Sequence, residues 1–313
     1  MILTKNCKKF VCILLAAACC LPLLSCSGSD FQTVSCPYSL RQIAMPDENT
    51  GWGLSMENEL LFTTDGVEHF ETVRRYETAS FDRFASAAFI DSQTAYTAVF
   101  SPDDNQLIVE RTDDSGASWR QTRIGFEDYA NICDAGSIFL GFSDRQHGYL
   151  LCCSTPAAGL MTKLLFFTDD SGESFSFTAD LTAAIAGYPQ GITAISEEQL
   201  YIAVTYHGTD SYLYQSSDRA KIWTSVDIFP RTEDVSYVDG YAPVFDTNKE
   251  YGVILLKIVG GQAVFHLFTT SDGGMHWSQG SEIPCDSPRA CAIACDGKIY
   301  IIDNSALMLY PSW

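Results

Sequence analysis

Three arginines are the residues of this sequence best suited to bind an anion together: Arg41, Arg83 and Arg289. Each precedes an aromatic residue of a β-prone run by 11 to 13 positions. The three arginines therefore have similar positions relative to the β-prone run that follows each of them. A guanidinium grips a carboxylate or a phosphate with two parallel hydrogen bonds. Three of them at one place would form an anion-binding site. The competing interpretation is that each arginine pairs with a neighbouring acid, such as Asp82 or Asp286.

Other signatures of catalysis or cofactor binding are missing from the sequence. It contains no GxxxxGK(S/T), HExxH or GxSxG segment, so nucleotide, zinc-peptidase and serine-hydrolase functions have no motif behind them. Its five histidines are scattered, and no cysteines have a convincing metal-ligand spacing. We therefore expect no metal and no cofactor. The formal charge of −20 argues against nucleic acid as a partner, because phosphates must be met by basic side chains.

The first 25 residues have the layout of a secretory leader. Lysines precede an apolar run over residues 10–24, and the run ends in Leu-Leu-Ser before Cys26. This ending resembles the lipobox of bacterial lipoproteins, which implies lipidation at Cys26 and a protein held on the extracytoplasmic face of the cell membrane. An ordinary cleaved leader is the alternative, and Cys19 is a competing cleavage site. We expect a signal peptide over 1–25, a tether over 26–30 and one domain over 31–313.

A short segment recurs five times along the rest of the chain. Each copy has a hydroxyl residue first, Asp third and an aromatic residue eighth, and three copies have Gly fifth. We number the copies box 1 to box 5. They cover residues 63–70, 112–119, 168–175, 216–223 and 270–277, and their aspartates are Asp65, Asp114, Asp170, Asp218 and Asp272.

This segment resembles the Asp-box of the sialidase-like, or BNR, repeat families. The resemblance implies a β-propeller in which the aspartate accepts main-chain N–H bonds within a hairpin turn. We interpret the five aspartates as structural rather than as calcium or catalytic sites. Val67 and Ala220 replace the fifth-position glycine in boxes 1 and 4, so we expect those two turns to be distorted. Flanking acids cluster at the same turns, so we expect much of the negative charge to lie on the hairpins.

The spacing of the boxes predicts the architecture. Their first positions are 49, 56, 48 and 54 residues apart, which suits one four-stranded propeller blade. Two β-prone runs precede each box, and the only short helical candidate is residues 181–186. After box 5 the chain offers three more strands, and residues 31–38 supply a spare one. We therefore predict an all-β, six-bladed propeller of four-stranded antiparallel blades, closed by the N-terminal strand. A seventh blade has no residues left to form it.

The predicted ring places Arg41, Arg83 and Arg289 on blades 1, 2 and 6, which are neighbours, and each just ahead of the innermost strand of its blade. We therefore expect them to converge at one mouth of the channel. The favoured function is a non-catalytic surface lipoprotein whose propeller binds an envelope protein or a glycan. The alternative is a degenerate sialidase-like glycoside hydrolase acting on an acidic sugar, although residues 40–46 lack the Phe/Tyr-Arg-Ile-Pro segment of sialidases. A third possibility is a role like that of the propeller factors of photosystem assembly, which share the repeat.

Overall fold

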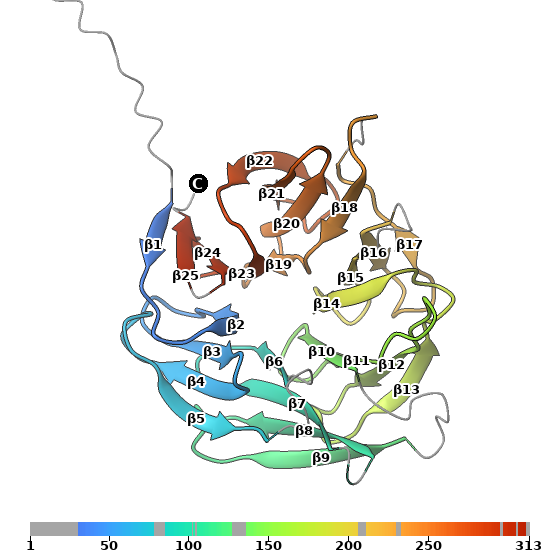
Figure 1. The fold of residues 1–313 in the computed structure, drawn as a ribbon. Coiled ribbons are helices and arrows are strands. Elements are labelled where there is room, and N and C mark those ends of the chain that lie inside the picture. The colour runs from blue at the N-terminus through green and yellow to red at the C-terminus, as the bar shows by residue number, and fades with distance from the viewer. Residues whose placement is uncertain are drawn as a thin grey trace, which may run out of the picture. The chain divides into compact units, whose positions relative to one another are not determined.

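The chain folds as an all-β ring, shown by a computed structural model (Figure 1). The structure describes residues 31–77, 85–101, 103, 105–126, 136–205, 211–229, 233–294, 297–304 and 306–310. The predicted leader, tether and Cys26 lie outside these residues. Six sheets of antiparallel strands follow one another around the ring, so the predicted six-bladed propeller is confirmed.

Each blade is a meander whose first strand lies innermost, beside the central channel. Blade 5 is the exception, because its inner position is shared by two short strands on either side of residues 241–243. The strands of blades 1 to 3 are β2 (Leu40–Ala44), β3 (Gly51–Ser55), β4 (Glu59–Thr63), β5 (Glu71–Arg75), β6 (Ser86–Phe89), β7 (Ala95–Ser101), β8 (Gln106–Thr112), β9 (Arg120–Gly125), β10 (Ser137–Phe142), β11 (Gly148–Cys153), β12 (Lys163–Thr168) and β13 (Ser176–Asp180). Those of blades 4 and 5 are β14 (Tyr188–Ala194), β15 (Leu200–Thr205), β16 (Leu213–Ser216), β17 (Thr224–Ser225), β18 (Tyr237–Gly240), β19 (Val244–Phe245), β20 (Gly252–Val259), β21 (Ala263–Thr270) and β22 (Ser278–Ile283).

The sixth blade joins the two ends of the chain. It consists of β23 (Pro288–Ile293), β24 (Ile299–Asp303), β25 (Ala306–Tyr310) and, outermost, β1 (Gln32–Val34). Gln32 pairs with Leu309 and Val34 with Leu307, and Figure 1 shows the blue strand β1 beside the red strand β25. The predicted closure by the N-terminal strand is therefore confirmed.

The hydrophobic core is divided among the spaces between neighbouring blades. The middle strands are buried on both faces, as in β11, where all six residues are buried, because each blade packs against one neighbour on each side. Aromatic side chains fill these spaces; Tyr96 of blade 2 stacks on Phe142 of blade 3. The described residues contain no helix, and the candidate at 181–186 forms a single turn closed by the bond from Ile185 N to Leu181 O.

The same aromatic position of the second strand links successive blades by a hydrogen bond. Trp52 donates from Nε1 to Asp91 O over 2.9 Å, and the hydroxyl of Tyr149 donates to Glu197 O over 2.6 Å. Two further tyrosines do the same, Tyr96 to Arg145 O over 2.7 Å and Tyr201 to Gly274 O over 3.2 Å. In each bond a polar tip on a buried ring reaches a turn of the next blade, which fixes the spacing of neighbouring blades.

The ring has two faces, which we name by the features that they carry. In every box-containing blade, the box turn donates a main-chain hydrogen bond to the turn that joins the blade's first two strands, as from Gly66 N to Asn49 O over 2.7 Å. Both turns therefore lie on one face, which we call the box face. Inner strands begin at the opposite face, which carries Arg41 and Arg289 and which we call the arginine face. The box face carries the five box aspartates together with Asp47, Asp91, Asp144 and Asp246.

The box turns follow one pattern with one departure. In boxes 2, 3 and 5 the fifth-position glycine has a positive φ, and its N–H donates to the first-position hydroxyl. Box 4 keeps this geometry, with Ala220 at φ 63° and Ala220 N bonded to Ser216 Oγ, so the expected distortion there was wrong. Box 1 is distorted: Val67 has no positive φ, and the Thr63 hydroxyl donates to Gly66 O instead. A β-branched side chain tolerates the left-handed region far less than alanine does.

No helix of the described residues is long and apolar enough to cross a membrane. The five described cysteines, at positions 36, 152, 153, 285 and 291, are not joined to one another by disulfide bonds.

Candidate functional site

The central channel holds two adjoining cavities enclosed by the inner strands. The larger, about 520 Å³, is lined by the first residues of these strands and lies toward the arginine face. The smaller, about 420 Å³, is lined by their last residues and the turns that follow, toward the box face. Six residues line both cavities, which places them in the middle of the channel: Ile43, Phe89, Leu140, Ile192, Thr193 and Val244.

Arg41 and Arg289 both line the larger cavity, so the structure brings together two of the three predicted arginines. Arg83 lies outside the described residues. We expected each arginine just ahead of its inner strand, but Arg41 and Arg289 are the second residues of β2 and β23. Each falls at a β-bulge. Leu40 and Gln42 pair with consecutive residues of β3, so Arg41 is the extra residue of its bulge.

The same bulge recurs in blade 4 and adds a third polar side chain to the mouth. Pro189 and Gly191 pair with consecutive residues of β15, which leaves Gln190 as the extra residue, and Gln190 lines the larger cavity. A bulge redirects a side chain that would otherwise follow the pleat. Sequence reasoning missed Gln190, although proline, which is tolerated at bulges, precedes both Gln190 and Arg289 and offered a signal.

Arg289 also holds the last blade to the first. Its Nη1 donates to Ser39 Oγ over 3.0 Å and to Leu40 O over 3.3 Å. These acceptors are neutral and immediately precede Arg41, so the two guanidinium groups belong to adjoining walls of the cavity. The alternative expectation of a pair with Asp286 is not what the described contacts of Arg289 show.

The larger cavity has a positive local charge within an acidic chain. Among the described residues that line it, Arg41 and Arg289 are the only charged ones, and none is acidic. Burial lowers the pKa of Arg41 to about 9, because a desolvated cation is destabilised. Burial also raises the pKa values of two other lining groups, Tyr241 and Cys291, to about 12. Both are therefore neutral at physiological pH, so they add no negative charge to the lining of the larger cavity.

Three polar side chains in the middle of the channel wall serve as links between blades. Gln42 Nε2 donates to Ala87 O over 3.0 Å, and Ala87 N donates back to Gln42 Oε1 over 2.9 Å. Ser86 Oγ accepts from Leu140 N over 3.1 Å, and the Thr193 hydroxyl donates to Pro243 O over 2.6 Å. What remains along the middle of the wall is mainly aliphatic and aromatic.

The smaller cavity is largely apolar with one cation at its rim. Met45, Phe142 and Phe245 are among its lining residues, together with Lys249 and Asp246. Burial lowers the pKa of Lys249, and the carboxylate of Asp246 accepts a bond from Tyr251 N. The positive charge of Lys249 and the negative charge of Asp246 nearly cancel at this rim. The mouth on the box face therefore lacks the net positive charge of the mouth on the arginine face.

The box aspartates are engaged within their own turns. Asp272 Oδ1 accepts from His276 N over 2.9 Å, and its Oδ2 lies 2.7 Å from His276 Nδ1. These bonds lower the pKa of Asp272 to about 2. In boxes 2 and 3 a serine hydroxyl takes the place of the histidine ring. The exposed group Asp65, Glu68 and His69 has the types of a metal site, but the Asp65 carboxylate is similarly occupied by His69.

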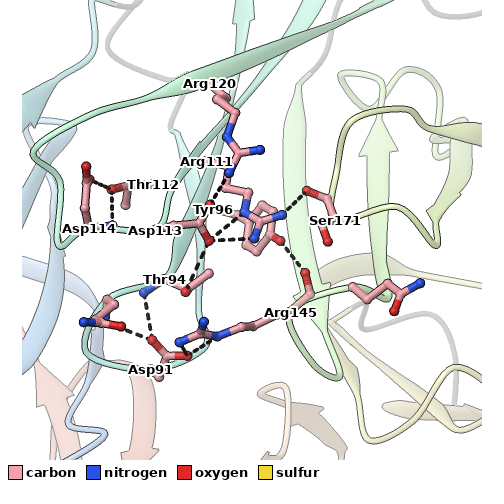
Figure 2. Close-up of polar contacts among 12 residues, drawn as sticks. Asp91, Thr94, Tyr96, Arg111, Thr112, Asp113, Asp114, Arg120, Arg145 and Ser171 are labelled. Carbon is pink, nitrogen blue, oxygen red and sulfur yellow. Dashed lines mark hydrogen bonds and ion pairs between the residues drawn. The ribbon is translucent and has the colours of Figure 1, made fainter.

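A second polar cluster lies on the box face between blades 2 and 3 (Figure 2). Asp113 accepts from Arg111 over 2.6 Å and from Arg120 over 2.6 Å, while Arg111 Nη1 also reaches Ser171 O of blade 3 over 3.0 Å. Asp91 binds Arg145 of blade 3 over 2.7 Å. Because each of these three guanidinium groups is bonded to a carboxylate, the cluster is a clamp between blades rather than a ligand site.

Comparison with known proteins gives likeness in fold only. No family model matches the chain, and no curated protein sequence matches it. The solved structure of YCF48 bound to D1 peptide matches with a TM-score of 0.55 at 14% identity, over 92% of this chain and 96% of that one. SapL1 lectin in complex with alpha methyl fucoside matches with a TM-score of 0.53 at 12% identity, over 87% and 90%. The GH74 enzyme of Niastella koreensis matches with a TM-score of 0.50 at 9% identity, over 90% of this chain and 53% of that one.

Proposed function

We propose that this chain is an exported, lipid-anchored and non-catalytic binding module that recognises an acidic group of an envelope protein or glycan at its arginine face. The observation that carries the proposal is the cavity of about 520 Å³ lined by Arg41 and Arg289 and by no described acid. Such a cavity offers charge and forked donors to a carboxylate. It also attracts anions locally within a chain of formal charge −20.

The structural likenesses support a binding role for a ring of this kind. YCF48 is seen with a peptide and SapL1 lectin with a fucoside, so propellers of closely similar size present surfaces to both ligand classes. From these proteins we take the two ligand classes proposed for this chain, peptide or glycan. From the two arginines we infer that the ligand carries an acidic group.

The proposed lipidation site precedes the ring in the chain. β1 pairs antiparallel to β25 and runs from the box face to the arginine face, so Phe31, the first described residue, lies at the box face. We propose that Cys26, which ends the lipobox-like segment, carries the lipid.

The alternative is hydrolysis of an acidic sugar, which needs carboxyl groups beside the scissile bond. No described residue lining the larger cavity is an Asp or a Glu, and its one described tyrosine, Tyr241, has no described acid lining the cavity beside it. The GH74 likeness covers 53% of that enzyme at 9% identity and carries no activity to this chain. Binding without turnover is therefore the function that the geometry favours.

Calorimetric titration of the purified protein with sialyllactose and with a Glu-rich peptide tests the proposal. We expect one of them to bind, and Arg41→Gln with Arg289→Gln to weaken that binding at least tenfold. Arg75→Gln is the control, because Arg75 lies 74% exposed on outer strand β5. Unchanged affinity in the double variant would refute the site. Release of the fluorophore from a fluorogenic sialoside, abolished in the double variant, would instead establish the hydrolase.

A further inference from the structure

The channel combines a cationic mouth with an apolar interior that continues beyond it. We propose that it binds an amphiphilic carboxylate, whose head lies at Arg41 and Arg289 and whose hydrocarbon chain extends along the channel toward the box face. This inference rests on the proposed function, because it uses the same arginine mouth. It goes beyond that function by adding a second ligand, a straight-chain fatty acid, which enters the channel where the acidic group of a protein or glycan reaches only the mouth.

The head position follows from the placement of the arginines. Both side chains line one cavity, and Arg289 is bonded to the residues that directly precede Arg41. Arg41 is half-buried, and desolvation depresses its pKa. A carboxylate brought to this place would lie beside two cationic side chains that line the same cavity, where a guanidinium can donate two parallel hydrogen bonds to it.

The path of the tail follows from the residues shared by the two cavities. Ile43, Phe89, Leu140, Ile192 and Val244 line both, so the apolar wall is continuous from one cavity to the next. From Arg41 to Met45 the inner strand advances about 13 Å at the usual rise per residue. Met45 is among the residues that line the smaller cavity, and its flexible side chain can adapt to the shape of a ligand.

The polar groups of the wall argue against a sugar or a peptide inside the channel. Both amide atoms of Gln42 are bound to Ala87, and the hydroxyl of Thr193 donates to Pro243 O. A sugar hydroxyl or a peptide group placed beside them would lose its bonds to water without replacement. A hydrocarbon chain has no such groups to satisfy, and its burial is favourable in proportion to its length.

A series of water-soluble carboxylates tests the inference by calorimetry on the full chain: butanoate, hexanoate and octanoate. We expect the affinity to rise about fourfold for each CH₂ that enters the channel, and to fall at least tenfold for all three in the Arg41→Gln, Arg289→Gln double variant. Ala88→Phe fills the smaller cavity, which Ala88 lines. It should remove the gain of octanoate over butanoate and leave butanoate binding unchanged.

Ile293→Thr is the second variant, because it keeps a β-branched side chain of smaller size and makes the smaller cavity, which Ile293 lines, more polar. It should reduce octanoate affinity alone. If affinity does not depend on chain length while the arginine variants still weaken binding, the proposed function stands and the channel inference is wrong. If chain length matters equally in wild type, Ala88→Phe and Ile293→Thr, the tail binds elsewhere and the inference also fails. If neither these carboxylates nor sialyllactose nor the acidic peptide binds, both proposals fall.

Discussion

The guanidinium of Arg289 donates a hydrogen bond to the hydroxyl oxygen of Ser39 over 3.0 Å, although the two residues are 250 positions apart in the chain. This bond joins blade 6 to the segment that leads into blade 1. Closure of the ring therefore rests on a partly buried side-chain contact near the channel as well as on the outer pairing of β1 with β25. Arg289 also lines the cavity of the proposed binding site, so that site and the closure of the ring share a side chain.

Replacing Arg289 by Gln should destabilise the ring. The variant loses the hydrogen bonds to Ser39 and Leu40, and the free energy of unfolding should fall by about 1–2 kcal/mol. Urea unfolding followed by tryptophan fluorescence measures the change. Arg75→Gln removes only an exposed ion pair with Glu59 and should cost less than about 0.5 kcal/mol. Equal effects of the two variants would contradict a closing role for Arg289.

The bonds from second-strand tyrosines to the next blade should each contribute to stability. Tyr149→Phe removes the bond of 2.6 Å to Glu197 O and should lower the free energy of unfolding by about 1 kcal/mol. Tyr38→Phe is the matched control, because the Tyr38 hydroxyl lies a long 3.4 Å from Phe70 O. A loss for Tyr38→Phe as large as for Tyr149→Phe would mean that the inter-blade bond is not the cause.

The fourth position of the box turn should prefer glycine. Ser171 has φ 66° and Gly273 has φ 70° at this position, and a left-handed backbone costs a residue with a Cβ about 1–2 kcal/mol. Part of this gain is offset by the entropy of glycine in the unfolded chain, so Ser171→Gly should raise stability by about 0.5–1 kcal/mol. Gly273→Ser should lower it by a similar amount. Thermal unfolding checks both, and changes of the same sign would refute the argument.

The His69–Asp65 pair should make stability depend on pH. Hydrogen bonding to Asp65 raises the pKa of His69, and bonding to His69 lowers the pKa of Asp65. The histidine's contribution is therefore fully present below pH 6.5, its ordinary value, and is lost as pH rises through the raised pKa. The aspartate's contribution is lost as acidification passes through the lowered pKa. His69→Ser keeps a donor, as Ser118 does in box 2.

Urea unfolding of wild type and His69→Ser at pH 5.5 and pH 8.5 isolates this effect, since the other histidines are common to both proteins. The wild type should lose stability relative to the variant at the higher pH. A difference between the two proteins that is constant with pH would show that the ring of His69 does not titrate as part of the pair.

Binding of a carboxylate at the arginine face should fail at high pH. The Arg41 guanidinium, with its pKa lowered to about 9 by burial, loses its proton as pH rises through that value. Tyr241 and Cys291, with pKa values of about 12, stay neutral there. Butanoate affinity measured from pH 7 to pH 10 should therefore fall above pH 9 in wild type. Arg41→Gln should bind more weakly at pH 7 and show a smaller decline.

The same pKa difference predicts an opposite trend in stability. Because the unfolded chain retains the Arg41 proton at pH values where the folded chain releases it, the free energy of unfolding should rise through pH 9 in wild type relative to Arg41→Gln. A stability difference that falls over this range would show that Arg41 is not desolvated in the folded ring.

The architecture was predictable from the sequence because its determinants are local. Each box specifies one hairpin turn through residues within eight positions, and the spacing then fixes four strands for each blade. Arg41 and Arg289 occupy equivalent positions in their repeats, and this was enough to predict that both lie at one mouth of the channel. Equivalent positions of successive repeats occupy equivalent places in successive blades. The position of a residue within its repeat therefore predicts on which face of the ring it lies.

The features that the sequence did not predict depend on contacts between blades or on the steric tolerance of particular side chains. The exposure of Gln190 at the mouth results from a bulge against β15, and Gln42 finds Ala87 across 45 positions. The turns of boxes 1 and 4 show the steric case: both lack the glycine, yet Ala220 tolerates the left-handed conformation and Val67 does not. The clamp of Arg111 and Asp113 likewise depends on where Ser171 of the next blade lies.

The three-residue strand β1 also determines the order in which the ring can be completed. Blades 1 to 5 form from hairpins between neighbouring segments, whereas Gln32 must find Leu309 from the opposite end of the chain, and such distant pairing is slow. Until then β25 offers an open edge, to which the β1 of another molecule fits equally well. If the chain crosses a membrane starting with its N-terminus, β1 stays unpaired until β25, the last strand, has also crossed. A high local concentration of chains whose rings are not yet closed favours the exchange of β1 between copies. A strand of only three residues is easily exchanged.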